Sequence, residues 1–388
     1  FFWVARMIFS GMEQMKKEPF HTVFIHGLVR DDKGRKMSKS LGNGIDPLEM
    51  ADKYGADALR FNLITGNSPG NDMRFYTEKC EAMRNFANKI WNASRYVMMN
   101  LSIDKCQVPD AAQLELEDKW VLSKLNDLIR DVTENMDSYE LGVASAKVYD
   151  FIWDTYCDWY IELTKARLYG EDESSKLVAQ QVLVYVLDQI LRLLHPYMPF
   201  ITEEIWQAIP HEGDFLMCSK WPEYREDFEF KAEKAAMETV MEAIRAIRAR
   251  RAEMNVPPSK KTVLYILSEK AEHFRQGTGF INRLAYAQET VVCNEAPAGF
   301  EDMVSVVTSD AKIFIPLDQL IDFEKEMERL NKEMEKARKE IANYEGKLSN
   351  QNFVSRAPEA VVNAERAKLE KAKALLAQLE TDAARLKK

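Results

Sequence analysis

The segment GRKMSKSLGN, at residues 34–43, says more about the protein than any other part of the sequence. Four cations lie within seven positions, at residues 33, 35, 36 and 39, and the hydroxyls of Ser38 and Ser40 lie among them. Lysine ammonium groups act as point charges on phosphate oxygens, and glycines allow the backbone to bend and to approach a ligand closely. The segment therefore suits a loop that holds a polyphosphate.

Such a loop points to one class of reaction, the formation of an adenylate. A carboxylate attacks the α-phosphate of ATP, and pyrophosphate leaves. A lysine that meets the charge building on the pyrophosphate lowers the barrier, because this contact is stronger in the transition state than in the ground state. A solvated basic loop is the alternative for any stretch rich in Lys, Ser and Gly.

The residues on either side of the loop predict short elements. Residues 22–25 read as a buried strand, and residues 31–47 are polar and rich in glycine. Asp46 is expected to cap a helix that has Pro47 in its first position. Residues 66–74 contain two glycines and a proline and predict a second loop.

The remainder of the chain divides by its periodicity. From about residue 77 to 255 apolar residues recur in steps of three and four, which predicts a helical bundle with a large aromatic core. Strands are expected at 262–267, 290–292 and 312–315, with a helix around 269–285. After them, two heptad stretches, broken only near Glu365, predict an antiparallel coiled-coil hairpin.

The overall composition sets wider limits. The chain has 388 residues, 46% hydrophobic and 30% charged, which is typical of a soluble globular protein with two to four domains. The net charge of −9 argues against a generic nucleic-acid coat but leaves room for a local basic patch. No apolar run approaches the length needed to span a bilayer. The five cysteines form no C-x-x-C pair, so we expect reduced thiols and no structural zinc.

The order of residues 36–40, KMSKS, resembles the second ATP-binding motif of class I aminoacyl-tRNA synthetases at all five positions. This order, rather than the composition, counts against a solvated loop. Other segments resemble the branch of that class that handles valine, isoleucine and leucine: HGLVRD at 26–31, YGADALRF at 54–61, NFANKIWN at 85–92 and HPYMPFITEEIW at 195–206.

The resemblance implies a multidomain, mainly α-helical chain. Residues 1–45 would end a Rossmann-type α/β catalytic domain, and residues 46–76 would form a stem-contact connector. Residues 77–255 would be a helical anticodon-binding domain, residues 256–318 a small α/β module, and residues 319–388 a coiled-coil arm that binds tRNA.

The end of the chain favours valine over the other amino acids of this branch. A heptad hairpin after a small module is similar to the tRNA-binding arm of valyl-tRNA synthetases, and NFV at 352–354 is typical of its linker. Isoleucine enzymes usually end in a cysteine-rich zinc module. The resemblance therefore implies valine, ATP and tRNA(Val) as partners. It implies Mg²⁺ with the ATP, no protein-bound metal, no membrane contact and a cytoplasmic monomer. An isoleucyl- or leucyl-tRNA synthetase is the alternative within the class.

The resemblance also implies roles for individual residues near the loop. Lys36 and Lys39 would be the catalytic cations on the ATP phosphates, with Ser38 beside them. Met37 would contact the adenine or anchor the loop. His26 and Gly27 would bind nucleotide unless they are structural, and Trp3 would be a wall of the amino-acid pocket or a core residue.

Arg245, Arg248 and Arg251 share one face of a predicted helix, where they would bind RNA phosphates or form a solvated surface. Asp57 and Arg60 are expected to form a local ion pair.

The five histidines include no His-x-Gly-His pair, which would be the first ATP motif of the class, and no editing domain is recognised. Because the chain opens on FFWVAR without an initiator Met, we interpret it as a piece of a larger enzyme and expect it to be inactive alone. A non-catalytic tRNA-binding relative and a scaffold that oligomerises through its coiled coil are the remaining alternatives.

Overall fold

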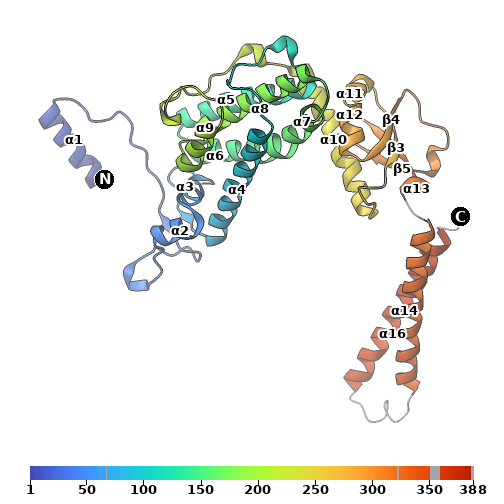
Figure 1. The fold of residues 1–388 in the computed structure, drawn as a ribbon. Coiled ribbons are helices and arrows are strands. Elements are labelled where there is room, and N and C mark those ends of the chain that lie inside the picture. Colours follow the sequence, from blue (N-terminus) through green and yellow to red (C-terminus); the bar gives the residue numbers. More distant parts are fainter. Residues whose placement is uncertain (67, 321–322, 350–358, 386–388) are drawn as a thin grey trace. The chain divides into compact units, whose positions relative to one another are not determined.

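A computed structural model describes residues 1–66, 68–320, 323–349 and 359–385 of the chain. It divides into two compact units, Phe1–Met237 and Glu238–Lys388, and each is considered by itself. The ribbon in Figure 1 is mostly helical, as the sequence predicted. The five domain limits given above stay predictions.

The first unit opens with α1 (Phe2–Met15), in which no residue is buried. The strand predicted at 22–25 is wrong, because this segment is irregular and the first ladder pairs β1 (Val29–Arg30) in parallel with β2 (Met73–Arg74). A Cβ on Gly27 would lie 1.7 Å from the carbonyl oxygen of Asn71. The two segments can therefore approach only because residue 27 is glycine.

Two short helices, α2 (Pro47–Tyr54) and α3 (Ala56–Ile64), follow the basic loop. The carboxylate of Asp46 accepts a hydrogen bond from the amide of Leu48, and Pro47 begins α2, which confirms the predicted cap. These helices contribute to one hydrophobic cluster, whose buried members are Tyr54, Ala58, Phe75 and Cys80.

Long helices then form the bundle of the first unit. They are α4 (Thr77–Met99), α5 (Leu116–Asp137), α6 (Leu141–Asp150), the π-helix η3 (Phe151–Tyr160), α7 (Ile161–Leu168), α8 (Glu173–Leu194), α9 (Pro199–Ala208) and the first turns of α10 (Lys231–Glu253). Trp120, Tyr156 and Trp206 are fully buried, so the aromatic core is confirmed.

From the sequence we expected no apolar run long enough to span a bilayer, and helix α8 contradicts this expectation. By length and composition alone it is apolar enough to do so, and it is the one described helix of this kind. Most of that apolar stretch is buried inside the protein, which is the environment of a core helix.

The start of α5 carries an ionic group that we call the Arg167 cluster: Glu117, Asp118, Tyr160 and Arg167. Arg167 Nη1 donates to Glu117 Oε1 at 3.0 Å and to Asp118 Oδ2 at 2.7 Å. The hydroxyl of Tyr160 donates to Asp118 Oδ1 at 2.7 Å. Burial raises the pKa of Glu117 to about 7, with the charge of Asp118 acting in the same direction, and burial also raises the pKa of Asp118.

The second unit contains a four-stranded sheet in the order β4-β3-β6-β5. Its elements are β3 (Thr262–Leu267), α11 (Ala271–Gln276), α12 (Thr278–Leu284), β4 (Ala287–Cys293), β5 (Met303–Val307) and β6 (Lys312–Pro316). Strands β3 and β4 pair in parallel, and the other pairs are antiparallel. The sequence predicted three of these strands and missed β5, an edge strand of five residues with little burial.

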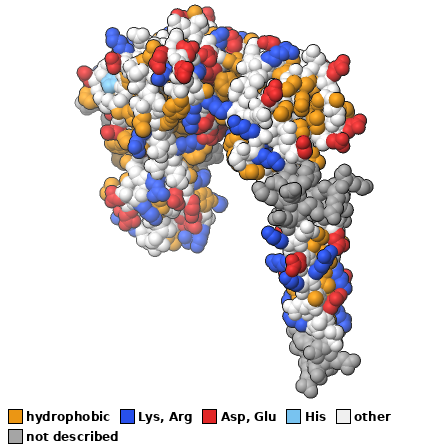
Figure 2. All heavy atoms as spheres, turned by 45° about the vertical axis from the view of Figure 1, so that its right-hand side comes forward, with side chains coloured by type: hydrophobic (Ala, Val, Ile, Leu, Met, Phe, Trp, Pro, Cys, Tyr) orange, Lys and Arg blue, Asp and Glu red, His pale blue; other side chains and the backbone are white. Residues whose placement is uncertain are grey.

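After α13 (Leu317–Leu320), the helices α14 (Phe323–Ser349) and α16 (Glu359–Arg385) pack along each other. Ion pairs join Glu345 to Lys373 and Arg338 to Glu380, so the helices run in opposite directions. Figure 2 shows acidic and basic side chains interspersed along this part of the surface.

The predicted seam residues Met334, Ala337, Ala372 and Leu379 are buried between these helices. Glu365, where the heptad pattern breaks, is also buried, and its carboxylate accepts from Lys347 at 3.4 Å and from Lys368 at 2.7 Å. The linker is predicted at residues 349–357, and all of it after Ser349 lies outside the described residues.

Candidate functional site

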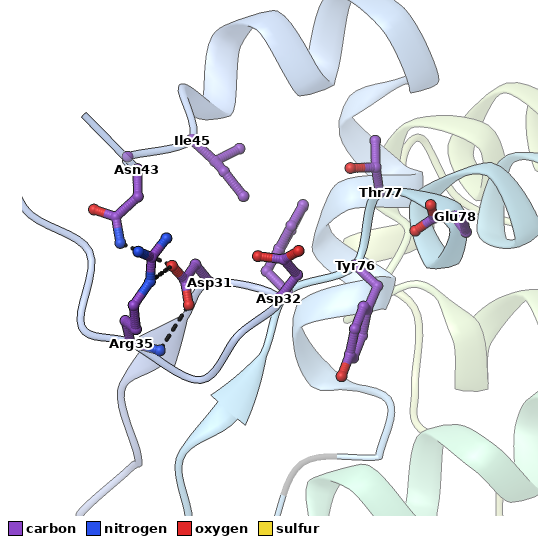
Figure 3. A pocket seen from close by; sticks show the side chains of 10 residues that line it. Asp31, Asp32, Arg35, Asn43, Ile45, Tyr76, Thr77 and Glu78 are labelled. Carbon is purple, nitrogen blue, oxygen red and sulfur yellow. Dashed lines mark hydrogen bonds and ion pairs between the residues drawn. The ribbon is translucent and has the colours of Figure 1, made fainter. Parts of the chain in front are cut away.

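The basic loop is folded around the carboxylate of Asp31, a buried residue directly after β1. Its Oδ1 accepts from the backbone N of Arg35 at 2.6 Å, and its Oδ2 accepts from Arg35 Nε at 2.7 Å and from Asn43 Nδ2 at 3.0 Å. These three side chains lie together in Figure 3. The hydrogen bond from Asn43 and those from Arg35 outweigh burial and lower the pKa of Asp31 to about 2, so the carboxylate is charged at neutral pH.

The side chain of Asn43 closes the loop. Its Oδ1 accepts from the backbone N of Ser38 at 3.0 Å, and its Nδ2 also donates to the carbonyl of Lys36 at 3.3 Å. Ser38 Oγ in turn accepts from the amide of Leu41 at 3.3 Å and caps the 3₁₀ turn η1 (Lys39–Leu41). The lysine-bearing segment is therefore tied at both ends.

Lys36 and Lys39 are exposed on this tied segment. Within the described ranges neither ammonium forms an ion pair. Ser38 and Ser40 Oγ lie 3.2 Å apart beside them. Two unneutralised cations and two hydroxyls on a held backbone are able to bind a polyphosphate.

A pocket of about 510 Å³ lies between the base of the loop and the first turn of α4. Asp31, Asp32 and Glu78 give its lining a negative charge, and Figure 3 shows Asp32 between the loop side chains and those of α4. This charge is wrong for phosphate, so the lysines rather than the pocket carry the phosphate chemistry. Among the described residues, no three His, Cys, Asp or Glu side chains are placed to hold a metal ion.

Comparison with known proteins agrees with this chemistry. The family model "tRNA synthetases class I (I, L, M and V)" matches residues 1–76, "Anticodon-binding domain of tRNA ligase" matches 118–266, and "Valyl tRNA synthetase tRNA binding arm" matches 322–387. The valine–tRNA ligase of Clostridium tetani is 58% identical over 97% of this chain and 43% of its own length. The chain is similar to valine–tRNA ligases over almost its whole length.

Two further relatives carry the same name. The valine–tRNA ligase of Clostridium acetobutylicum is 53% identical over 100% of this chain and 44% of its own length, and that of Bacillus cereus is 51% identical over 95% and 42%. The chain thus spans less than half the length of the curated relatives that it matches.

Met37, between the two lysines in the sequence, is partly buried. Its side chain packs against the hydrophobic cluster of Tyr54, Ala58, Phe75 and Cys80. This contact is the anchoring role, one of the two that the sequence left open, and a contact with adenine stays a prediction. The loop therefore combines a partly buried Met37 with two exposed lysines, Lys36 and Lys39.

Three predicted residues lie apart from the loop. His26 and Gly27 line a separate pocket of about 250 Å³ together with Phe24 and Tyr139. His26 Nδ1 lies 2.8 Å from the carbonyl oxygen of Gly27. Trp3 is 71% exposed on α1, with the guanidinium of Arg6 5.4 Å from its ring centroid. The nucleotide and valine contacts of these residues stay predictions.

The three predicted arginines of α10 do not share one surface. Arg245 and Arg248 are exposed. Arg251 contradicts the prediction, because its side chain is buried and donates to the carbonyls of Pro257 and Lys260. Arg251 therefore holds the turn before β3 and does not offer its guanidinium to RNA.

The predicted ion pair between Asp57 and Arg60 is replaced by bonds to the backbone at residues 196–201. Asp57 accepts from the amides of Phe200 and Ile201, and Arg60 donates to the carbonyls of Pro196 and Tyr197. Sequence reasoning missed these bonds, and it also missed Asp31 and Asn43. The one available signal was the presence of these polar residues inside the quoted family segments.

Proposed function

We propose that this chain is part of a valine–tRNA ligase. The whole enzyme would join valine to ATP, forming valyl-adenylate and releasing pyrophosphate, and would then transfer the valyl group to tRNA(Val) and release AMP. The observation that carries the proposal is the 58% identity to a valine–tRNA ligase over 97% of the chain. The tied loop, whose two lysines form no ion pair with any residue that the structure describes, gives that identity a chemical basis.

The loop residues would act on the pyrophosphate. Lys36 and Lys39 would contact the β- and γ-phosphate oxygens and gain strength as negative charge builds there. Ser38 would add a hydroxyl donor, while Asn43 and Asp31 would hold the backbone in place before ATP arrives. We expect Mg²⁺ to enter as a partner of the ATP phosphates rather than of side chains in this chain.

We also propose that tRNA binds to the bundle and to helices α14 and α16. The matched family models are named for anticodon binding and for a tRNA-binding arm. The arm would be a coiled-coil hairpin within one chain, since the two helices satisfy each other's apolar seam. This self-contained seam supports a monomer, and the five free cysteines suit the cytoplasm.

The test of chemistry uses the full-length protein that contains this chain. We expect valine-dependent ATP–pyrophosphate exchange, with a loss of about 10²-fold in kcat for Lys39→Ala or Lys36→Ala, as for other groups that stabilise transition-state charge. Lys105→Ala, an exposed lysine far from the loop in sequence, is the matched control and should leave exchange unchanged. Exchange that prefers isoleucine or leucine would refute the valine assignment, and no exchange at all would favour a non-catalytic relative.

The test of the arm is a deletion of residues 320–388 from the same protein. We expect the KM for tRNA(Val) to rise while valine-dependent exchange without tRNA is retained. An unchanged KM would contradict the tRNA-binding role. Light scattering of the intact protein separates a monomer from a scaffold that oligomerises through these helices.

A further inference from the structure

Helix α9 lacks a cap of its own. Its N-cap residue, Met198, offers no side-chain hydrogen bond, and Pro199 has no amide hydrogen. The next two amides are satisfied from another helix: Asp57 Oδ1 accepts from Phe200 N at 3.3 Å and Oδ2 accepts from Ile201 N at 2.7 Å. A carboxylate at this end also complements the helix dipole. Asp57 on α3 therefore acts as the cap of α9.

Arg60, one turn later on α3, binds the other side of the same elbow. Its Nε donates to the carbonyl of Tyr197 at 3.2 Å, and its Nη2 donates to that of Pro196 at 3.1 Å. These carbonyls follow the end of α8. The elbow between α8 and α9 is thus held by an acceptor and a donor from one helix.

The opposite side of α3 contributes to the hydrophobic cluster that the basic loop also contacts. In a helix, residues 58 and 59 lie about 100° and 200° from residue 57, whereas residue 60 lies about 60° from it. Ala58 is a buried member of the hydrophobic cluster, and both Leu59 of this helix and Met37 of the loop pack against that cluster. One nine-residue helix therefore contributes to the cluster that anchors the loop on one side and contacts the bundle on the other.

We propose that Asp57 and Arg60 are positioning residues for the transfer of the amino acid to tRNA. They fix the bundle to helix α3, which shares a hydrophobic cluster with the basic loop. A tRNA held by the bundle would therefore meet the loop in one geometry. This inference rests on the proposed function. The two residues would contact neither ATP nor tRNA, and adenylate formation without tRNA does not need them.

The test measures exchange and aminoacylation separately on the full-length protein. For Asp57→Asn and Arg60→Met we expect valine-dependent exchange without tRNA, and the KM for tRNA(Val), to stay within about twofold of wild type. We expect the kcat of aminoacylation to fall about tenfold, because a displacement of about 1 Å at a reacting centre can cost up to 10²-fold. Arg60→Lys keeps the charge and reaches one carbonyl, and should recover part of the loss.

Asp52→Asn, the same chemical change at an exposed carboxylate on α2, is the matched control and should leave both activities unchanged. Equal losses in exchange and aminoacylation would mean a purely structural role and would overturn the proposal, as would wild-type aminoacylation by both variants. If Asp57→Asn does not fold, Arg60→Met still shows whether aminoacylation falls while exchange is retained. Absence of exchange in the wild-type protein would count against the proposed function and not against this inference.

Discussion

Two of the places where carboxylates meet an arginine differ in how far the arginine is exposed. At the basic loop, Asp31 pairs with Arg35, whose side chain is 51% exposed. In the Arg167 cluster the arginine is 9% exposed, and the side chains of Glu117 and Asp118 are 2% and 0% exposed. The first group shapes a surface loop, and the second joins helices inside the bundle.

The difference shows in the pKa values. Hydrogen bonds dominate at Asp31, and its pKa is lowered to about 2. Burial dominates at Glu117, and its pKa is raised to about 7 although Arg167 opposes the change. A pair with an exposed arginine holds a loop at little energetic risk, whereas a group in which every member is buried stabilises the fold only while every partner is present.

The largest effect is expected when the buried arginine is removed. Arg167→Met leaves Glu117 and Asp118 buried without a counter-charge, which should lower the free energy of unfolding of the first unit by about 3–5 kcal/mol. All seven tryptophans precede residue 238, so urea unfolding followed by tryptophan fluorescence reports on this unit. Arg84→Met, which breaks an exposed pair with Glu81, is the control and should cost at most about 1 kcal/mol. If both variants lowered the free energy of unfolding equally, the proposed difference between buried and exposed ionic groups would be contradicted.

A smaller effect is expected from pH. Because the folded-state pKa of Glu117 is about 7, above its usual 4.5, the folded protein binds more protons between these values. The contribution of Glu117 to the free energy of unfolding is complete below about pH 4.5 and is lost as pH rises through 7, by about 3 kcal/mol. The urea midpoint of wild type should therefore fall between pH 5 and 8. Glu117→Gln should flatten this slope, and an identical slope in the variant would contradict the assignment.

At the loop the expected effect is on rate rather than on stability. Asn43→Ala removes the bonds to Ser38, Lys36 and Asp31, so the lysines lose their fixed backbone. Valine-dependent exchange in the full-length protein should fall about tenfold, or about 1.4 kcal/mol of barrier, with the urea midpoint of the first unit nearly unchanged. Asn71→Ala, in the loop that precedes β2, serves as the control. A loss of unfolding free energy as large as the increase in the barrier would contradict a role of Asn43 in rate rather than in stability.

The smallest effect is expected at the exposed partner. Arg35→Met removes one of the three bonds to Asp31, while the backbone amide of residue 35 still donates to Oδ1. Exchange should fall less than about threefold, and the difference from wild type should shrink at 0.5 M salt as the pair is screened. A loss that does not change with salt would contradict a role of Arg35 through its ion pair with Asp31.

The sequence predicted well where local order carries the information. The KMSKS segment, the cap at Asp46 and the buried residues of the seam follow from neighbours a few positions apart. It failed where a side chain is satisfied by backbone distant in sequence. Arg251 has the spacing of a surface arginine, and only the turn at residues 257–260 makes it an interior residue. Asp31 likewise organises the loop only because the side chain of Asn43, twelve residues later, donates a hydrogen bond to its carboxylate.

The cap that Asp57 supplies to α9 has a consequence for chimaeric enzymes. A bundle transplanted from residue 77 onward, the predicted domain limit, would lack Asp57. The amides of Phe200 and Ile201 would then lose their hydrogen-bond acceptor unless the recipient protein supplied another. Grafts between relatives should therefore carry residues 56–64 with the bundle, and should also retain a Met37 equivalent in the recipient loop. The practical splice point lies before Gly55, inside a stretch that sequence patterns assign to the connector.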